Sequence, residues 1–205
     1  MTIEIIEEGP SVLSTYATVP IAFEVNAVLD ERTLDAWRRG DSLPAIPLDT
    51  PYTKDYDRHP GNHPMEWPTR FHMASWGFLG AYDDGTRVGA AVIVVADTQV
   101  ELLEGQSDVA LLWDLRVAPA ARRLGVGRAL LDRAEEWASE HGAHWMRVET
   151  QQVNVPACRF YVALGFTLEH IRRGVYADLP HEIQLLWAKR LVFAANLDDR
   201  LSSRA

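Results

Sequence analysis

Alternating apolar and polar residues predict extended strands in the first half of the chain. Residues 2–7 alternate as a half-buried strand does, and Ile21–Val28 is rich in β-branched residues. Two apolar runs, Phe78–Tyr82 and Val88–Asp97, are separated by Asp83-Asp84-Gly85, which is a hairpin signal with a glycine where φ is positive. We therefore expect an antiparallel meander to begin near residue 78.

In the second half of the chain, strands alternate with helices. Helical spacing of Val126, Leu130, Ala134, Trp137 and Ala138 predicts a helix that ends at Gly142. A second helix is expected after Asn154, a favourable N-cap, and before Gly165. The expected order is a strand Val109–Val117, a helix Val126–His141, a strand Trp145–Thr150, a helix Val155–Ala163, a hairpin Phe166–Leu191 and a tail 192–205 that is a candidate helix.

The segment 41–76 has a different composition, rich in Pro, Asp, His and Trp. Its prolines are expected to interrupt regular structure, which predicts a long ordered surface loop. Long loops are more often functional than idle, so this one is a candidate wall of a substrate site. The prolines are Pro44, Pro47, Pro51, Pro60, Pro64 and Pro68.

Length and composition predict one domain over residues 1–205 and a cytoplasmic protein. The single cysteine, Cys158, excludes an internal disulfide and a cysteine-built zinc site. No apolar run approaches the roughly 18–20 residues of a membrane-spanning helix, and the N-terminus is acidic where a signal peptide is basic. A formal charge of −9 does not favour nucleic acid as a partner. His59, His63 and His72 have no cysteine or carboxylate at metal-ligand spacing, so no metal is expected.

The loop Arg122-Arg123-Leu124-Gly125-Val126-Gly127 predicts a phosphate site. A strand that leads through a glycine turn into a helix presents unpaired N–H groups and the positive end of the helix dipole. Two glycines allow close approach to the main chain, and arginines, including Arg128 in the first helical turn, supply charge. The dinucleotide pattern G-x-G-x-x-G fails at Leu130, and no P-loop sequence occurs.

These motifs together resemble the GNAT superfamily of N-acetyltransferases. The shared features are the strand LRVAP, the loop RRLGVGRAL, a helix, a strand, and the pattern N-x-x-A-x-x-F-Y-x-x-x-G-F from Asn154 to Phe166. The resemblance covers about residues 76–190. It implies an α/β (α+β) fold in which a mixed sheet of about six to seven strands has helices on both faces, and a splayed strand pair that holds acyl-CoA.

The resemblance also implies roles for individual residues. Main-chain groups of Leu115, Arg116 and Val117 would bind the pantetheine arm of acetyl-CoA, and the segment Arg122–Arg128 would bind its pyrophosphate. Asn154, Ala157 and Phe160 would flank the arm. Tyr161 would donate a proton to the departing thiolate.

Attack of an amine on a thioester also needs a proton acceptor, since an alkylamine with a pKa of about 10.4 is protonated at neutral pH. Asp114 and Glu149 are the best-placed carboxylates. The alternative for either one is an ion pair with Arg116 or Arg147 at a strand end. Strand alternation puts Asp114 and Leu115 on opposite faces, and the sequence does not assign the faces.

Local strings further resemble the streptothricin acetyltransferases and related antibiotic-modifying enzymes. They are Phe23-Glu24-Val25, the run from Pro51 to Tyr56, Glu149-Thr150-Gln151 and the run from Ala157 to Tyr161. This likeness implies a small cationic amine as acceptor. The segment Asp57–Trp76 departs from that group, and Trp67 is its candidate cavity residue.

Three alternatives stay open: a protein N-terminus as acceptor, a lysine side chain as acceptor, or a non-catalytic acyl-CoA sensor. The C-terminal hairpin and tail are the candidate surface for a homodimer, because GNAT proteins frequently pair there.

Overall fold

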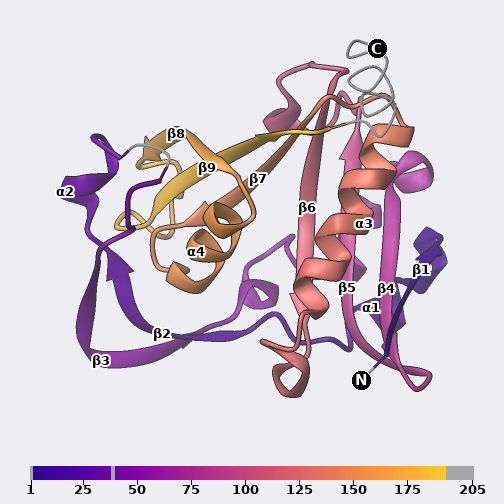
Figure 1. Cartoon of the computed structure of the whole chain (residues 1–205), viewed down its shortest axis with the longest axis horizontal. Coiled ribbons are helices and arrows are strands. Elements are labelled where there is room, and N and C mark those ends of the chain that lie inside the picture. The colour runs from indigo at the N-terminus through magenta and orange to yellow at the C-terminus, as the bar shows by residue number, and fades with distance from the viewer. Residues whose placement is uncertain (1, 38–39, 193–205) are drawn as a thin grey trace, which may run out of the picture.

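A seven-stranded mixed sheet forms the centre of this computed structural model, which describes residues 2–37 and 40–192 (Figure 1). Its strand order is β1-β4-β5-β6-β7-β9-β8, and only β6 and β7 run parallel. The strands are β1 Ile3–Glu8, β4 Gly77–Asp83, β5 Thr86–Val95, β6 Val109–Val117, β7 Trp145–Gln151, β8 Thr167–Arg173 and β9 Ile183–Arg190. The prediction of a mixed sheet of about six to seven strands is confirmed.

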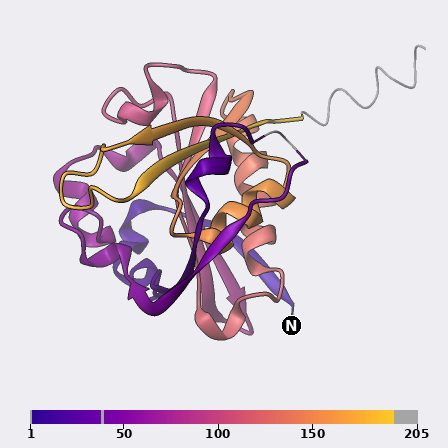
Figure 2. The same ribbon diagram turned by 90° about the vertical axis from the view of Figure 1, so that its left-hand side faces the viewer.

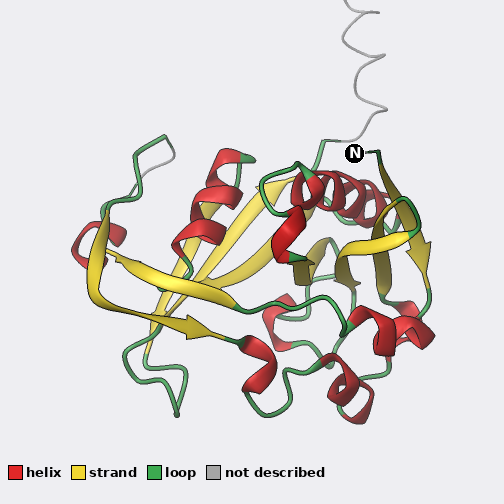
Figure 3. Ribbon diagram, turned by 90° about the horizontal axis from the view of Figure 1, so that it is seen from below, coloured by secondary structure: helices red, strands yellow, loops and turns green. Residues whose placement is uncertain are grey.

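Helices and helical turns cover both faces of this sheet (Figure 3). The longest, α3, packs across β4, β5 and β6 and buries its apolar stripe there, while α4 packs on the same side over β7. The opposite face is covered by α1 and short 3-10 turns that enclose a second core cluster. The helices are α1 Leu13–Tyr16, α2 Glu31–Leu34, α3 Val126–Glu140 and α4 Val155–Ala163. The 3-10 turns are η1 Pro10–Val12, η2 Tyr56–Arg58, η3 Pro64–Thr69, η4 Met73–Ser75, η5 Glu101–Leu103 and η6 Pro119–Ala121.

β6 and β7 separate part-way along their length. Residues 109–112 of β6 pair with residues 145–148 of β7, and beyond that point β6 pairs only with β5 and β7 only with β9. A register shift in the β5–β6 pairing, between Val92 and Ile93, accompanies this separation. The predicted splayed strand pair is therefore present, and it opens a cleft between the two halves of the sheet.

The segment 41–76 differs from the sequence prediction. Residues 45–54 form a strand, β3 Ala45–Lys54, that pairs with β2 Phe23–Leu29 in a separate two-stranded ribbon (Figure 2). The expectation that prolines interrupt all regular structure here was wrong. Among the described residues β3 pairs with β2 alone, so its other side is an open edge. An edge strand tolerates proline where the missing N–H would face that open edge. Residues 56–75 are irregular apart from 3-10 turns, as predicted.

A few side chains of this second part of the segment are buried against the sheet. Trp67, Met73 and Trp76 are nearly inaccessible and join Tyr16 in the second core cluster. The Trp67 indole N–H donates to the Asn62 carbonyl at 2.8 Å, which orders the turn before η3. The predicted surface loop thus supplies core residues as well as a wall of the cleft. The tail prediction for residues 193–205 lies outside the described residues.

Candidate active site

A cavity of about 980 Å³ follows the gap between β6 and β7. It extends from the segment Asp57–Trp76 on one face of the sheet to the N-terminus of α3 on the other. The structure brings the predicted site residues together here: all of them line the cavity except Leu124 and Val126. Leu124 is exposed, and Val126 is buried in the core under α3, so the side chains of these two lie elsewhere.

The glycine-bearing loop has the geometry that binds phosphate. Gly125 is the N-cap residue of α3 with φ +89°, and Arg123 also has a positive φ. A Cβ at Gly125 would meet no atom within 4 Å, so the backbone conformation and not crowding requires glycine there. The helix has no side-chain cap at this end, so its first N–H groups face the cavity mouth without a side-chain acceptor.

Three arginines near the N-terminus of α3 have different hydrogen-bond and ion-pair partners. The Arg122 guanidinium donates to the carbonyls of Val117 (3.0 Å) and Ala22 (2.8 Å), which braces the end of β6. Arg123 and Arg128 line the cavity, and Arg128 lies 3.4 Å from Asp132 in an exposed i,i+4 pair. This end of the cavity is basic and suits an anionic group.

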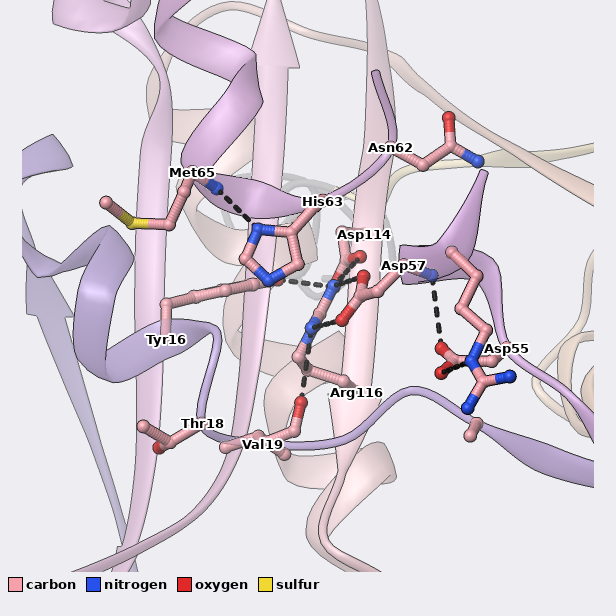
Figure 4. A network of polar contacts seen from close by, with 12 residues as sticks. Tyr16, Thr18, Val19, Asp55, Asp57, Asn62, His63, Met65, Asp114 and Arg116 are labelled. Atoms are coloured by element: carbon pink, nitrogen blue, oxygen red, sulfur yellow. Dashed lines mark hydrogen bonds and ion pairs between the residues drawn. The ribbon is translucent and has the colours of Figure 1, made fainter. Parts of the chain in front are cut away.

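The opposite end contains a buried ion-pair network (Figure 4). The Arg116 side chain is fully buried and donates to both carboxylate oxygens of Asp114, at 2.9 and 2.7 Å, and to both of Asp57, at 3.0 and 3.2 Å. It also donates to the Val19 carbonyl, and the Tyr16 hydroxyl donates to Asp114 at 2.5 Å. Burial alone would lower the pKa of Arg116, but Asp114 and its other anionic neighbours outweigh burial and raise it. Burial, with Asp114 adding to it, raises the pKa of Tyr16.

This network answers the question that the sequence left open for Asp114. Asp114 forms the ion pair with Arg116 that was its alternative to a catalytic role, and its oxygens accept three hydrogen bonds. Its two oxygens are thus already engaged by donors of the protein itself. Asp57 was not identified from the sequence as a site residue, although it lies within the loop that was.

Removal of the Arg116 charge is expected to destabilise the fold strongly. An Arg116→Met variant leaves two adjacent carboxylates with no cation, and loss of one partner of a buried pair costs about 3–5 kcal/mol. Urea unfolding at neutral pH measures this change. Arg128→Met removes an exposed pair and should cost under about 1 kcal/mol. Equal losses in the two variants would contradict a structural role for the buried network.

Glu149 lies on β7 and has neutral partners. The Tyr176 hydroxyl and the Gln151 amide (3.2 Å) both donate to its Oε1 atom. The alternative partner, Arg147, instead pairs with Glu104 and Glu169. Among the described residues no ion pair to Glu149 is present, and its side chain lines the cavity. Of the two candidate carboxylates, Glu149 is therefore better placed to accept a proton.

Tyr161 is 6% exposed and lines the same cavity from α4. Within the described part of the chain, its hydroxyl has no hydrogen-bond partner, and the hydroxyl oxygen is not fully buried. Because the residue lines the cavity, this oxygen faces the cavity. Burial raises the pKa of Tyr161, and Asp114 and Cys158 raise it further. The phenol is therefore protonated at neutral pH and can donate a proton. Phe160, beside it, packs at 5.1 Å between ring centroids.

The N-terminus of α4 is fixed by Asn154, as predicted. Its Oδ1 atom accepts the Ala157 N–H at 3.2 Å, and its Nδ2 donates to the Tyr56 hydroxyl at 3.4 Å. Cys158 on the same helix is fully buried, and burial raises the pKa of its thiol to about 12. A protonated, inaccessible thiol is not a nucleophile, which supports direct attack of the amine over an acyl-cysteine route.

Further residues line the cavity that the sequence reasoning did not single out. Tyr56 and Asn62 come from the segment after β3. Tyr56 and Gln151 stand inside strings that resemble the streptothricin group, so those strings carried a signal for them. Nothing in the sequence pointed to Tyr176, which reaches the site from the turn between β8 and β9.

Histidines of the loop do not form a metal centre. His63 caps η3 by accepting the Met65 N–H at 3.3 Å (Figure 4). Among residues 2–37 and 40–192, no group of three His, Cys, Asp or Glu side chains could hold a metal ion. No helix in that part of the chain is long and apolar enough to cross a membrane.

The sequence of this chain is similar to known acetyltransferases. The sequence model that describes the acetyltransferase (GNAT) family matches residues 47–166. Streptothricin acetyltransferase A of Bacillus subtilis (strain 168) is 34% identical over 91 residues, which cover 43% of this chain and 53% of that protein. The chain thus spans about half the length of that curated relative.

Two solved structures cover nearly all of the chain. The crystal structure of nourseothricin acetyltransferase has a TM-score of 0.71 and 25% identity, and the match covers 94% of this chain and 100% of that one. A Bacillus anthracis str. Ames protein crystallised with acetyl coenzyme A has the same TM-score and coverage at 23% identity, which supports the fold.

Proposed function

Because the chain belongs to the acetyltransferase (GNAT) family, we propose that it transfers an acetyl group from acetyl-CoA to a primary amine of a small cationic molecule. The observation that carries this proposal is the charge distribution of the cavity. Arg122, Arg123 and Arg128 line one end, beside the N-terminus of α3. The carboxylates of Asp57, Asp114 and Glu149 line the other end, and the buried Arg116 guanidinium pairs with the first two.

The basic end fits the pyrophosphate of acetyl-CoA. Main-chain N–H groups at a helix N-terminus and nearby arginines are the groups that hold phosphates. Arg159 of α4 also lines the cavity, but its guanidinium donates to the Leu43 carbonyl at 3.0 Å. When bound, acetyl-CoA supplies the thioester that donates the acyl group. Main-chain groups of Leu115, Arg116 and Val117 would hold its pantetheine arm, with Asn154, Ala157 and Phe160 alongside.

The acidic end fits the acceptor. A protonated amine is attracted to the excess of carboxylates, and Glu149 takes its proton so that the nitrogen lone pair can attack the acyl carbon. As the C–N bond forms and the C–S bond breaks, Tyr161 gives its proton to the thiolate and regains one from the nitrogen through solvent. One proton per turnover leaves with the solvent.

Names of the relatives support this acceptor class. Streptothricin acetyltransferase A and nourseothricin acetyltransferase are named for antibiotics, which makes an antibiotic-like amine the proposed acceptor. A cytoplasmic location and pairing through the C-terminal hairpin accompany the proposal as sequence predictions.

Reciprocal variants test the two ends separately. Asp57→Asn replaces a charged acceptor by a neutral one and should raise KM for the amine about tenfold, roughly 1.4 kcal/mol, with KM for acetyl-CoA unchanged. Arg123→Ala should raise KM for acetyl-CoA by a similar factor and leave KM for the amine unchanged. If both variants altered the same KM, the assignment of the two ends would be wrong.

A further inference from the structure

Hydrogen bonds between residues of the cavity wall form a series with one direction. Asn154 cannot reverse its amide, because Oδ1 accepts the Ala157 N–H and a backbone N–H can only donate. Its Nδ2 therefore donates to the Tyr56 oxygen at 3.4 Å, and the Tyr56 hydroxyl donates to Gln151 Oε1 at 2.5 Å.

The direction continues to Glu149. With Oε1 of Gln151 occupied by Tyr56, its Nε2 donates to the Tyr176 oxygen at 2.8 Å and to Glu149 Oε1 at 3.2 Å. The Tyr176 hydroxyl then has Glu149 Oε1 as its acceptor. The series of hydrogen bonds thus ends at Glu149, where the Gln151 amide and the Tyr176 hydroxyl donate to the same carboxylate oxygen.

Both tyrosines are held as neutral donors. Burial raises the pKa of Tyr56, and burial followed by the charge of Glu149 raises the pKa of Tyr176. Neither hydroxyl ionises near neutral pH, so the donors and acceptors in this series of hydrogen bonds keep their roles at that pH. Within the described residues no hydrogen bond reaches the second oxygen of Glu149, Oε2, and the side chain lines the cavity.

We infer that Tyr56, Gln151 and Tyr176 are positioning residues that anchor Glu149 Oε1 to the N-cap of α4 and to the β8–β9 turn, which leaves Oε2 for the amine. This inference rests on the proposed function and deepens it. Four separate parts of the chain meet in the network: η2, the end of β7, the start of α4 and the β8–β9 turn. Of these segments, η2 and the β8–β9 turn contribute none of the residues assigned to acetyl-CoA, so changes at Tyr56 and Tyr176 should alter acceptor chemistry without altering acetyl-CoA binding.

Tyr176→Phe removes the hydroxyl that donates directly to Glu149 and should lower kcat about tenfold, with KM for acetyl-CoA unchanged. Tyr56→Phe acts one step further away and should lower kcat by about threefold. Tyr52→Phe is the matched control, because Tyr52 is an exposed tyrosine of β3, the same ribbon that leads into Tyr56, and it should behave as wild type.

A double-mutant cycle separates positioning from a general structural effect. In a Glu149→Gln background the Tyr176→Phe substitution should have no further effect on kcat, since the hydroxyl acts through that carboxylate. A tenfold loss that persists in this background would overturn the inference, as would wild-type kcat in both tyrosine variants. Absence of thiol release by the wild-type protein with every amine would overturn the proposed function itself, and the inference with it.

Discussion

Replacing Gly125 with glutamate is expected to abolish binding of acetyl-CoA. The residue occupies the left-handed region at the start of α3, where a side chain strains the backbone, and its carboxylate would stand where the pyrophosphate is proposed to lie. Loss of the helix-terminus contacts together with like-charge repulsion should weaken binding at least about 100-fold, or roughly 2.7 kcal/mol. Titration calorimetry with acetyl-CoA measures this change directly.

Gly142→Glu provides the matched control. Gly142 follows the other end of the same helix with nearly the same φ, +86° against +89°, and a Cβ at either glycine would meet no atom within 4 Å. Both variants therefore carry the same backbone strain, and only Gly125→Glu places charge at the cavity. If the two variants bound acetyl-CoA equally well, the loop at residues 122–127 would not be the phosphate site.

Replacing Tyr161 with phenylalanine is expected to slow turnover about 10²–10³-fold, within the roughly 10²–10⁴-fold that general acid catalysis contributes, with little change in affinity for acetyl-CoA. The ring remains packed against Phe160 and Phe166, so only the hydroxyl that faces the cavity is lost. Steady-state kcat, together with the dissociation constant for acetyl-CoA, separates the chemical step from binding.

Cys158→Ala, on the same helix, should retain turnover within about twofold, because the thiol is buried and protonated. Unchanged kcat in Tyr161→Phe would remove that residue from the mechanism. Loss of turnover in Cys158→Ala with the fold intact would instead point to an acyl-enzyme route.

The elements around the site could be predicted from sequence because their signals are local. The β6 bounds, the start of α3 at Val126 and the bounds of α4 agree with the expectations drawn from periodicity, glycines and the Asn154 cap. The spacing of the loop 122–127 and of the motif from Asn154 to Phe166 carried the family resemblance, and the family match bears it out.

Other features depend on contacts between distant segments and left no local pattern. Asp57 meets Arg116 across 59 positions, and Tyr56 meets Gln151 across 95, so neither pairing is visible in spacing. The proline-rich sequence of β3 predicts a loop, because prolines are compatible with a strand only at the edge of a sheet. That β3 lies at such an edge depends on its pairing with the distant strand β2. The faces of Asp114 and Leu115 are likewise set by distant contacts, since Asp114 accepts a hydrogen bond from Tyr16 of one core cluster and Leu115 packs against the other cluster.

The most direct test of the central claim is thiol release from acetyl-CoA by the wild-type protein across a panel of amines. The panel contains streptothricin, aminoglycosides, polyamines and amino acids, with neutral and anionic amines of similar size as controls. A cavity with one basic end for acetyl-CoA and one acidic end for the acceptor predicts turnover of small cationic amines and little turnover of neutral or anionic ones. Binding of acetyl-CoA without thiol release across the whole panel would contradict the account and favour a protein acceptor or an acyl-CoA sensor.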